Sequence, residues 1–248
     1  MQTNIFVSEK QKKVLRSLLS LDFECGGPLH LTGNEIDCVE IYVGEQNFVE
    51  FPQWTECRKH HLTFHTHPPH SSHNDSLLSP PSPSDTIVYT LANAYLYPEI
   101  RRTALVVTKE GCYITRVTAQ YKPHNVSLLD YLQDSYDLVI ALWMRYERLI
   151  YTDRNVAQNI FSIVEKCWGV HIHLVPWEEL KEIPLYTSPP SLSPSDIGKE
   201  KREKGEELDR SQIIAHKDKW AHLSEEEFLS LLNDNCLISH LIQEGSLK

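Results

Sequence analysis

A short apolar segment, Leu62–Phe64, runs directly into His65-Thr66-His67-Pro68, and the next residues are rich in proline, serine and histidine. The apolar segment is typical of a strand, whereas the composition of residues 68–84 favours a loop. A helical pattern then follows from Thr86 to Tyr97 and is opened by Ser84-Asp85. This order predicts a strand, a loop and a helix in succession, with two histidines at the end of the strand.

The two histidines are candidates for metal binding. Side chains two residues apart on a strand point to the same side, so His65 and His67 can reach one ion. Zinc prefers nitrogen and carboxylate donors, and a catalytic zinc site leaves one position for water. The alternative is a polar loop with adventitious metal affinity, because six of the thirteen histidines lie within residues 60–73.

A third ligand is needed, and Asp85 is the candidate because it stands at the start of the predicted helix. A carboxylate at this position is also favoured by the helix dipole, so an ordinary N-terminal helix acid is the alternative interpretation. A second Ser-x-x-Asp sequence, Ser72 to Asp75, lies closer to His67, but no helical pattern follows it. We therefore prefer the pair Ser82 and Asp85.

Together these residues resemble the JAMM signature of the JAB/MPN metalloproteases. That signature is a distant Glu, then His-x-His-Pro, then Ser-x-x-Asp, and it matches Glu24, residues 65–68 and residues 82–85. One departure is the spacing, because fourteen residues separate His67 from Ser82 where the family usually has seven. The resemblance covers residues 1–122 and implies an α/β fold, in which a mixed, curved sheet is flanked by helices.

The resemblance also implies a role for each site residue. His65, His67 and Asp85 would bind Zn²⁺, with water as the fourth ligand. Glu24 would take a proton from that water and deliver it to the leaving amine. Ser82 would donate a hydrogen bond to the oxyanion. Proline at position 28, after Gly26-Gly27, is a second departure and suggests a sheet edge or a bend.

The chain divides into four predicted parts. Residues 1–122 form the JAB/MPN-like domain and residues 123–186 an α+β accessory region. Residues 187–210 combine Ser-Pro repeats with a dense charge run, which predicts a flexible linker. Residues 211–248 form a helical segment, and its last helix begins at Ser224-Glu225. The extension beyond the first domain is therefore mostly helical.

The function implied by the resemblance is a zinc isopeptidase or peptidase that cuts after the C-terminal tail of ubiquitin or a ubiquitin-like protein. The alternative is a scaffold or structural subunit of the same fold with little or no catalysis. The C-terminal half is suited to holding a protein partner in either case. A zinc deaminase is disfavoured, because its His-x-Glu and Pro-Cys-x-x-Cys motifs are missing.

Composition restricts partners and location. The net charge of −10 argues against a general nucleic-acid binder, which needs Lys and Arg for phosphate contacts. No apolar run approaches the roughly 20 residues that cross a bilayer, and charged residues from Glu9 to Lys13 stand where a signal peptide needs an apolar core. We therefore expect no membrane contact, a cytoplasmic location and six reduced cysteines.

Overall fold

The computed structural model describes residues 2–45, 49, 60–69, 77–96, 102–119, 126–186 and 212–232. Within these residues the strands are β1 (Gln2–Phe6), β2 (Cys25–Thr32), β3 (Glu35–Val39), β4 (Tyr42–Val43), β5 (Leu62–Thr66), β6 (Thr103–Val107), β7 (Gly111–Val117), β8 (Val170–Pro176) and β9 (Glu182–Tyr186). The helices are α1 (Glu9–Ser17), the 3₁₀ turn η1 (Leu18–Ser20), the π-helix η2 (Ser84–Leu91), α3 (Ala92–Leu96), α4 (Leu128–Arg145), α5 (Glu147–Ile150) and α6 (Arg154–Trp168). Residues 225–232 are helical as well.

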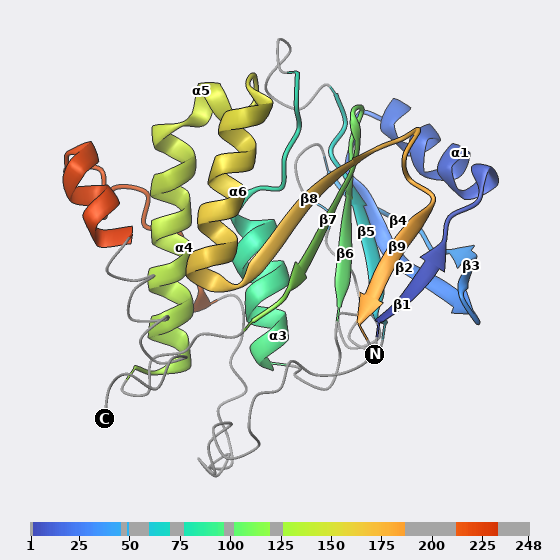
Figure 1. Cartoon of the computed structure of the whole chain (residues 1–248), viewed down its shortest axis with the longest axis horizontal. Coiled ribbons are helices and arrows are strands. Elements are labelled where there is room, and N and C mark those ends of the chain that lie inside the picture. The colour runs from blue at the N-terminus through green and yellow to red at the C-terminus, as the bar shows by residue number, and fades with distance from the viewer. Residues whose placement is uncertain are drawn as a thin grey trace.

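The strands form one mixed sheet in the order β8-β7-β6-β5-β2-β3-β1-β9, with β4 paired to β2. The β5–β6 and β1–β3 pairs are parallel, and the other pairs are antiparallel. Eight strand positions would span about 34 Å in a flat sheet. The link from Pro176 to Glu182 reaches at most about 21 Å, so the sheet must curl to join its two ends (Figure 1).

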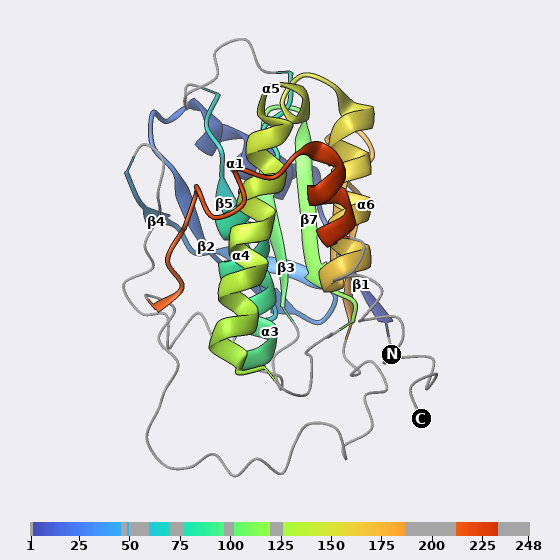
Figure 2. The ribbon, with the colours of Figure 1, turned by 90° about the vertical axis from the view of Figure 1, so that its left-hand side faces the viewer.

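Helices cover both faces of this sheet. On β6, Val106 packs with Ile87 of η2 and Leu142 of α4, whereas its neighbour Leu105 packs with Leu15 of α1. Adjacent strand residues point to opposite faces, so the two apolar cores lie on opposite sides of the sheet. Figures 1 and 2 show α3, α4 and α6 gathered on one side and α1 on the other. The predicted α/β class, a mixed curved sheet flanked by helices, is confirmed at this level.

Several helices and strands begin or pair as the local sequence predicts. The Ser8 hydroxyl accepts from the Gln11 amide, and the Gln11 side chain accepts from the Ser8 amide, so α1 begins with the predicted capping box. β6 and β7 form a hairpin, as the turn residues 109–111 between two β-rich segments predict. The strand expected near residues 36–43 is divided into β3 and β4, which are separated by Glu40-Ile41.

The main difference from expectation is β2. Pro28 after Gly26-Gly27 suggests a sheet edge or a bend, but these residues lie in a strand between β5 and β3. A Cβ on Gly27 would lie 2.0 Å from the Glu40 carbonyl oxygen, so only glycine allows this approach. The pairing partner changes from β4 to β3 at Glu40-Ile41, opposite Pro28, which lacks an amide hydrogen.

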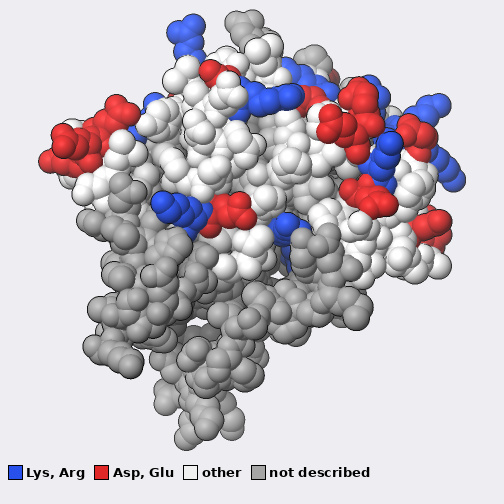
Figure 3. All heavy atoms as spheres, in the orientation of Figure 1, with Lys and Arg blue, Asp and Glu red and all other residues white. Residues whose placement is uncertain are grey.

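The surface carries both signs of charge. In the view of Figure 3, acidic and basic side chains are mixed in the region of α1, and neither sign of charge forms a patch there. Among the residues that the structure describes, no helix is both long and apolar enough to cross a bilayer. Cys167 is disulfide-bonded, whereas Cys25, Cys38 and Cys112 are free. The expectation of reduced cysteines is therefore wrong for Cys167.

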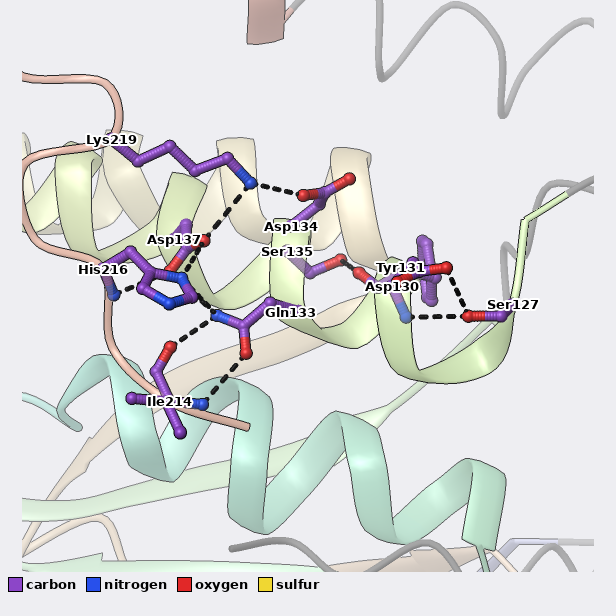
Figure 4. Close-up of polar contacts among 10 residues, drawn as sticks. All are labelled: Ser127, Asp130, Tyr131, Gln133, Asp134, Ser135, Asp137, Ile214, His216 and Lys219. Carbon is purple, nitrogen blue, oxygen red and sulfur yellow. Dashed lines mark hydrogen bonds and ion pairs between the residues drawn. The ribbon is translucent and has the colours of Figure 1, made fainter. Parts of the chain in front are cut away.

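Residues 212–232 lie against α4 and α6 (Figure 2). Phe228 and Leu232 are buried in the same apolar core as Leu142 of α4 and Val164 of α6. Polar contacts from Gln133, Asp134 and Asp137 of α4 hold residues 214–219 (Figure 4). The predicted linker, 187–210, and the end of the chain after residue 232 fall outside the described residues, and the division into four parts stays a prediction.

Candidate metal centre

Three predicted ligands meet at one point in the structure. His65 Nε2 lies 3.2 Å from Asp85 Oδ1, and His67 Nε2 lies 3.4 Å from Asp85 Oδ2. The two Nε2 atoms are 3.2 Å apart. All three ligand atoms lie within 4.8 Å of one another, and no other group of His, Cys, Asp and Glu in the described part of the chain converges in this way. The three side chains could hold a metal ion.

The histidines are placed by the sheet. His65 belongs to β5, where it pairs with Gly26 of β2 and with Val106 of β6. His67 follows β5, and its backbone amide continues the pairing by donating to Val107 O at 2.9 Å. Both histidines are therefore supported on the strand that occupies the middle of the sheet, where backbone movement is restricted from both sides.

Asp85 is placed by the start of η2. Its carboxylate oxygen Oδ2 accepts from the Ser82 amide at 2.7 Å, and its own amide donates to Ser82 Oγ at 3.1 Å. This reciprocal pair satisfies amides that a helix start leaves free. The helix then continues with π geometry, in which Ala92 N donates to Ile87 O. Short π-helical segments are frequent at functional sites.

The electrostatics of Asp85 favour its ionised form. Only 12% of its side chain is exposed, and burial alone would raise the pKa of this carboxyl. The two imidazoles, by charge and by hydrogen bonds, instead hold the pKa of Asp85 well below its usual range. A buried carboxylate and two imidazoles together form a suitable ligand set for a divalent cation.

Glu24 lies beside these three residues. It directly precedes β2, and continuing the pairing of Gly26 with His65 by two residues sets Glu24 opposite His67. Burial raises the pKa of Glu24 to about 7, the charge of His67 lowers it, and the charge of Asp85 raises it. The carboxyl is therefore poised to exchange a proton near neutral pH, as a general base requires.

Thr66, between the two histidines, is a positioning residue that the sequence reasoning did not identify. Its side chain is fully buried, and Oγ1 accepts from the Cys25 amide at 2.8 Å. This bond fixes the backbone directly after Glu24 to the strand that carries the histidines. The alternation along β5 could have indicated that Thr66 points away from them and toward the interior.

Other sequence candidates are not part of this group. His70, His73 and the alternative pair Ser72 and Asp75 lie outside the described residues. A second His-x-His sequence, His171 and His173 on β8, has stacked rings 6.2 Å apart, and His171 contacts Glu165 at 2.9 Å. These side chains do not form a converging group of three ligands in the described structure.

The centre thus consists of two histidines at the end of a central strand, an aspartate at a helix start, and a glutamate at the beginning of the neighbouring strand. The resemblance to the JAMM signature rests on the sequence motif alone. No protein-family model, curated protein or solved structure matches the chain.

Proposed function

We propose that the protein is a zinc-dependent isopeptidase or peptidase of the JAMM type, built on a JAB/MPN-like fold. The observation that carries this proposal is the convergence of His65, His67 and Asp85 beside a glutamate whose pKa is raised to about 7. Ubiquitin and ubiquitin-like conjugates are the substrate class that the resemblance supplies.

The ligand set fits zinc. Two imidazole nitrogens and one carboxylate oxygen are the donors that zinc prefers, and three protein ligands leave one position for water. A zinc ion held there would bring the pKa of a bound water close to 7. Asp85 is already ionised in its surroundings, so it needs no proton loss before it binds a cation.

Glu24 and Ser82 supply the remaining groups. A carboxyl with a pKa near 7 accepts a proton from water and returns it to a leaving amine at neutral pH. The Ser82 hydroxyl oxygen accepts from the Asp85 amide, which leaves its hydrogen available for donation to an oxyanion. Glu24 would thus accept the proton that water loses and donate the proton that the leaving amine gains.

Metal analysis tests the centre. We expect about one zinc per chain in the purified protein, lost with a chelator and restored by added zinc. The variant with both His65→Ala and His67→Ala should lose the metal. The matched control replaces the other His-x-His pair, His171→Ala with His173→Ala on β8, and should keep it. Equal zinc content in the two variants would end the proposal.

An activity assay distinguishes the proposed enzyme from the scaffold alternative. Glu24→Gln should keep zinc and lose hydrolysis of ubiquitin or ubiquitin-like conjugates by at least about 10²-fold, because the proton acceptor is gone. A wild-type protein that binds zinc but cleaves none of a panel of such conjugates and peptides would favour the structural-subunit alternative.

A further inference from the structure

The residues that lead into the Ser82–Asp85 turn are held from two sides. The amides of Leu77 and Leu78 both donate to Tyr151 O at 3.0 Å, and the Leu78 side chain is buried in the core beside α4. The next amide, that of Ser79, donates to a carboxylate oxygen of Glu110. Residues 77–79 are therefore anchored to α5 at one end and to the β6–β7 turn at the other.

Ser79 connects Glu110 to a predicted metal ligand. Its amide contacts Glu110 Oε1, and its carbonyl oxygen lies 3.3 Å from His67 Nδ1. A carbonyl can only accept, so Nδ1 of His67 carries the hydrogen in this contact. In the neutral imidazole the other ring nitrogen, Nε2, then has the lone pair that a metal would take, and it is the atom that faces Asp85 and His65.

Glu110 is itself held rigidly. The turn between β6 and β7 is closed by the Thr108 amide and hydroxyl, which donate to Gly111 O at 2.9 and 3.0 Å. Trp177 Nε1 donates to Thr108 O at 3.1 Å, and the Tyr113 hydroxyl donates to Glu110 Oε1 at 3.0 Å. The same hairpin also binds the His67 backbone through Val107 O.

The two oxygens of the Glu110 carboxyl have different surroundings. Oε2 is buried and has no hydrogen-bond partner in the part of the chain that the structure describes. An unsatisfied buried oxygen costs stability, about 1–3 kcal/mol or more for a charged group. The other oxygen of the same carboxyl accepts from the Ser79 amide, whose peptide contacts His67.

We propose that Glu110 is a positioning residue for the metal centre and acts on His67 through the Ser79 peptide. The inference rests on the proposed function, because it assumes that His67 binds zinc through Nε2. Histidine ligands of metals generally donate their other ring N–H to a carbonyl or carboxylate, which sets the tautomer and the ring orientation. Glu110 holds the Ser79 carbonyl in the position that this hydrogen bond requires.

Zinc affinity of the full chain, measured by competition with a chromophoric chelator, tests the role. Glu110→Ala should weaken zinc binding by about 10- to 100-fold, the usual effect of removing an outer partner of a ligand. Glu110→Gln keeps an oxygen that accepts from Ser79 and should restore most of the affinity. Glu165→Ala is the matched control, because it removes a carboxylate that contacts His171, remote from the centre.

A spectroscopic measurement separates positioning from simple stabilisation. In the zinc-loaded wild type, long-range ¹H–¹⁵N NMR should show His67 with hydrogen on Nδ1 and metal on Nε2. In Glu110→Ala the Nδ1–H signal should broaden or be lost by exchange. A purely structural role for Glu110 would lower the melting temperature of the metal-free protein and leave both the affinity and this signal unchanged.

The outcomes are distinguishable. Wild-type protein that binds no zinc would overturn the proposed function and this inference together. Wild type that binds zinc while Glu110→Ala binds it equally well would overturn the positioning role alone. If Glu110→Ala does not fold, wild type decides the question, because zinc coordination by Nδ1 of His67 would contradict the proposal directly.

Discussion

The backbone amide of Cys25 donates to Thr66 Oγ1 at 2.8 Å, which joins two segments that are 41 residues apart in the sequence. Each is the neighbour of a site residue, because Cys25 follows Glu24 and Thr66 stands between the two histidines. This bond, together with the pairing of β2 with β5, therefore sets the distance between the proposed general base and the proposed ligands.

Replacing Thr66 with valine keeps the shape of the side chain and removes this acceptor. The Cys25 amide is then buried without a partner, so we expect Thr66→Val to lower the free energy of unfolding by about 1–3 kcal/mol. Thr66→Ser keeps the hydroxyl and should lose less. Urea unfolding of the metal-free protein measures both, and a valine variant as stable as wild type would show that the bond contributes nothing.

The raised pKa of Glu24 predicts a pH-dependent stability in the metal-free protein. Below pH 4.5 the carboxyl is protonated in both states, whereas between 4.5 and about 7 only the folded state keeps the proton. Stability contributed by this group is therefore lost as the pH rises through that interval, by up to about 3 kcal/mol.

Glu24→Gln removes the loss of stability that ionisation of the buried carboxyl causes. The variant should match wild type at pH 4.5 and exceed its free energy of unfolding by about 1–3 kcal/mol at pH 8, both measured in the presence of a chelator. Glu35→Gln, at an exposed position on β3, is the control and should show no such divergence. A difference between Glu24→Gln and wild type that is constant across pH would contradict the assigned burial of Glu24.

We predict that Ser82 affects the rate of the reaction more than the binding of zinc. Ser82→Ala should keep about one zinc per chain and lower the turnover of a cleavable conjugate by about 10²–10³-fold, the usual effect of losing one oxyanion donor. Ser84→Ala is the control two residues further on, since the Ser84 hydroxyl contacts Tyr136 instead. Equal turnover in the two variants would leave Ser82 with only its helix-start role.

The ligand residues could be predicted because their signals are local. Two histidines at the end of an apolar strand and an aspartate at a helix start can each be identified within a few residues, and the structure brings these three together. Their convergence could not be derived from spacing. It depends on the fold, because Glu24 and Asp85 meet the histidines only through the pairing of β2 with β5 and the packing of η2. Glu24 was identified only from the resemblance.

The missed elements depend on distant partners. β1 and β9 pair with each other at one end of the strand order, although they are separated by most of the described chain. β2 contains Gly26-Gly27-Pro28, which locally indicates a turn, and becomes a strand because β5 and β3 lie on either side. Glu110 gives no local signal beyond a turn, since its contact with Ser79 spans 31 residues.

The docking of residues 212–232 depends on a buried charge. The Asp137 side chain is 0% exposed, yet it receives hydrogen bonds from the His216 amide at 3.0 Å, His216 Nδ1 at 3.1 Å and Gln133 Nε2 at 3.0 Å (Figure 4). Lys219 Nζ lies 3.4 Å from the same carboxylate. A buried carboxylate is destabilising when it loses a donor and stays buried, so removing a donor while the segment is docked should cost stability.

His216→Ala removes one side-chain donor to Asp137 and should lower the free energy of unfolding by about 1–3 kcal/mol. The same change should increase amide hydrogen exchange and proteolytic cleavage within residues 212–232, because the docked segment is released more often. Lys217→Ala is the matched control, since Lys217 is exposed beside His216, and it should stay within about 0.5 kcal/mol of wild type. If the two variants exchange and unfold alike, the contact between His216 and Asp137 does not hold the segment on α4. The other contacts, such as Gln133 with Ile214 and the burial of Phe228, would then hold it.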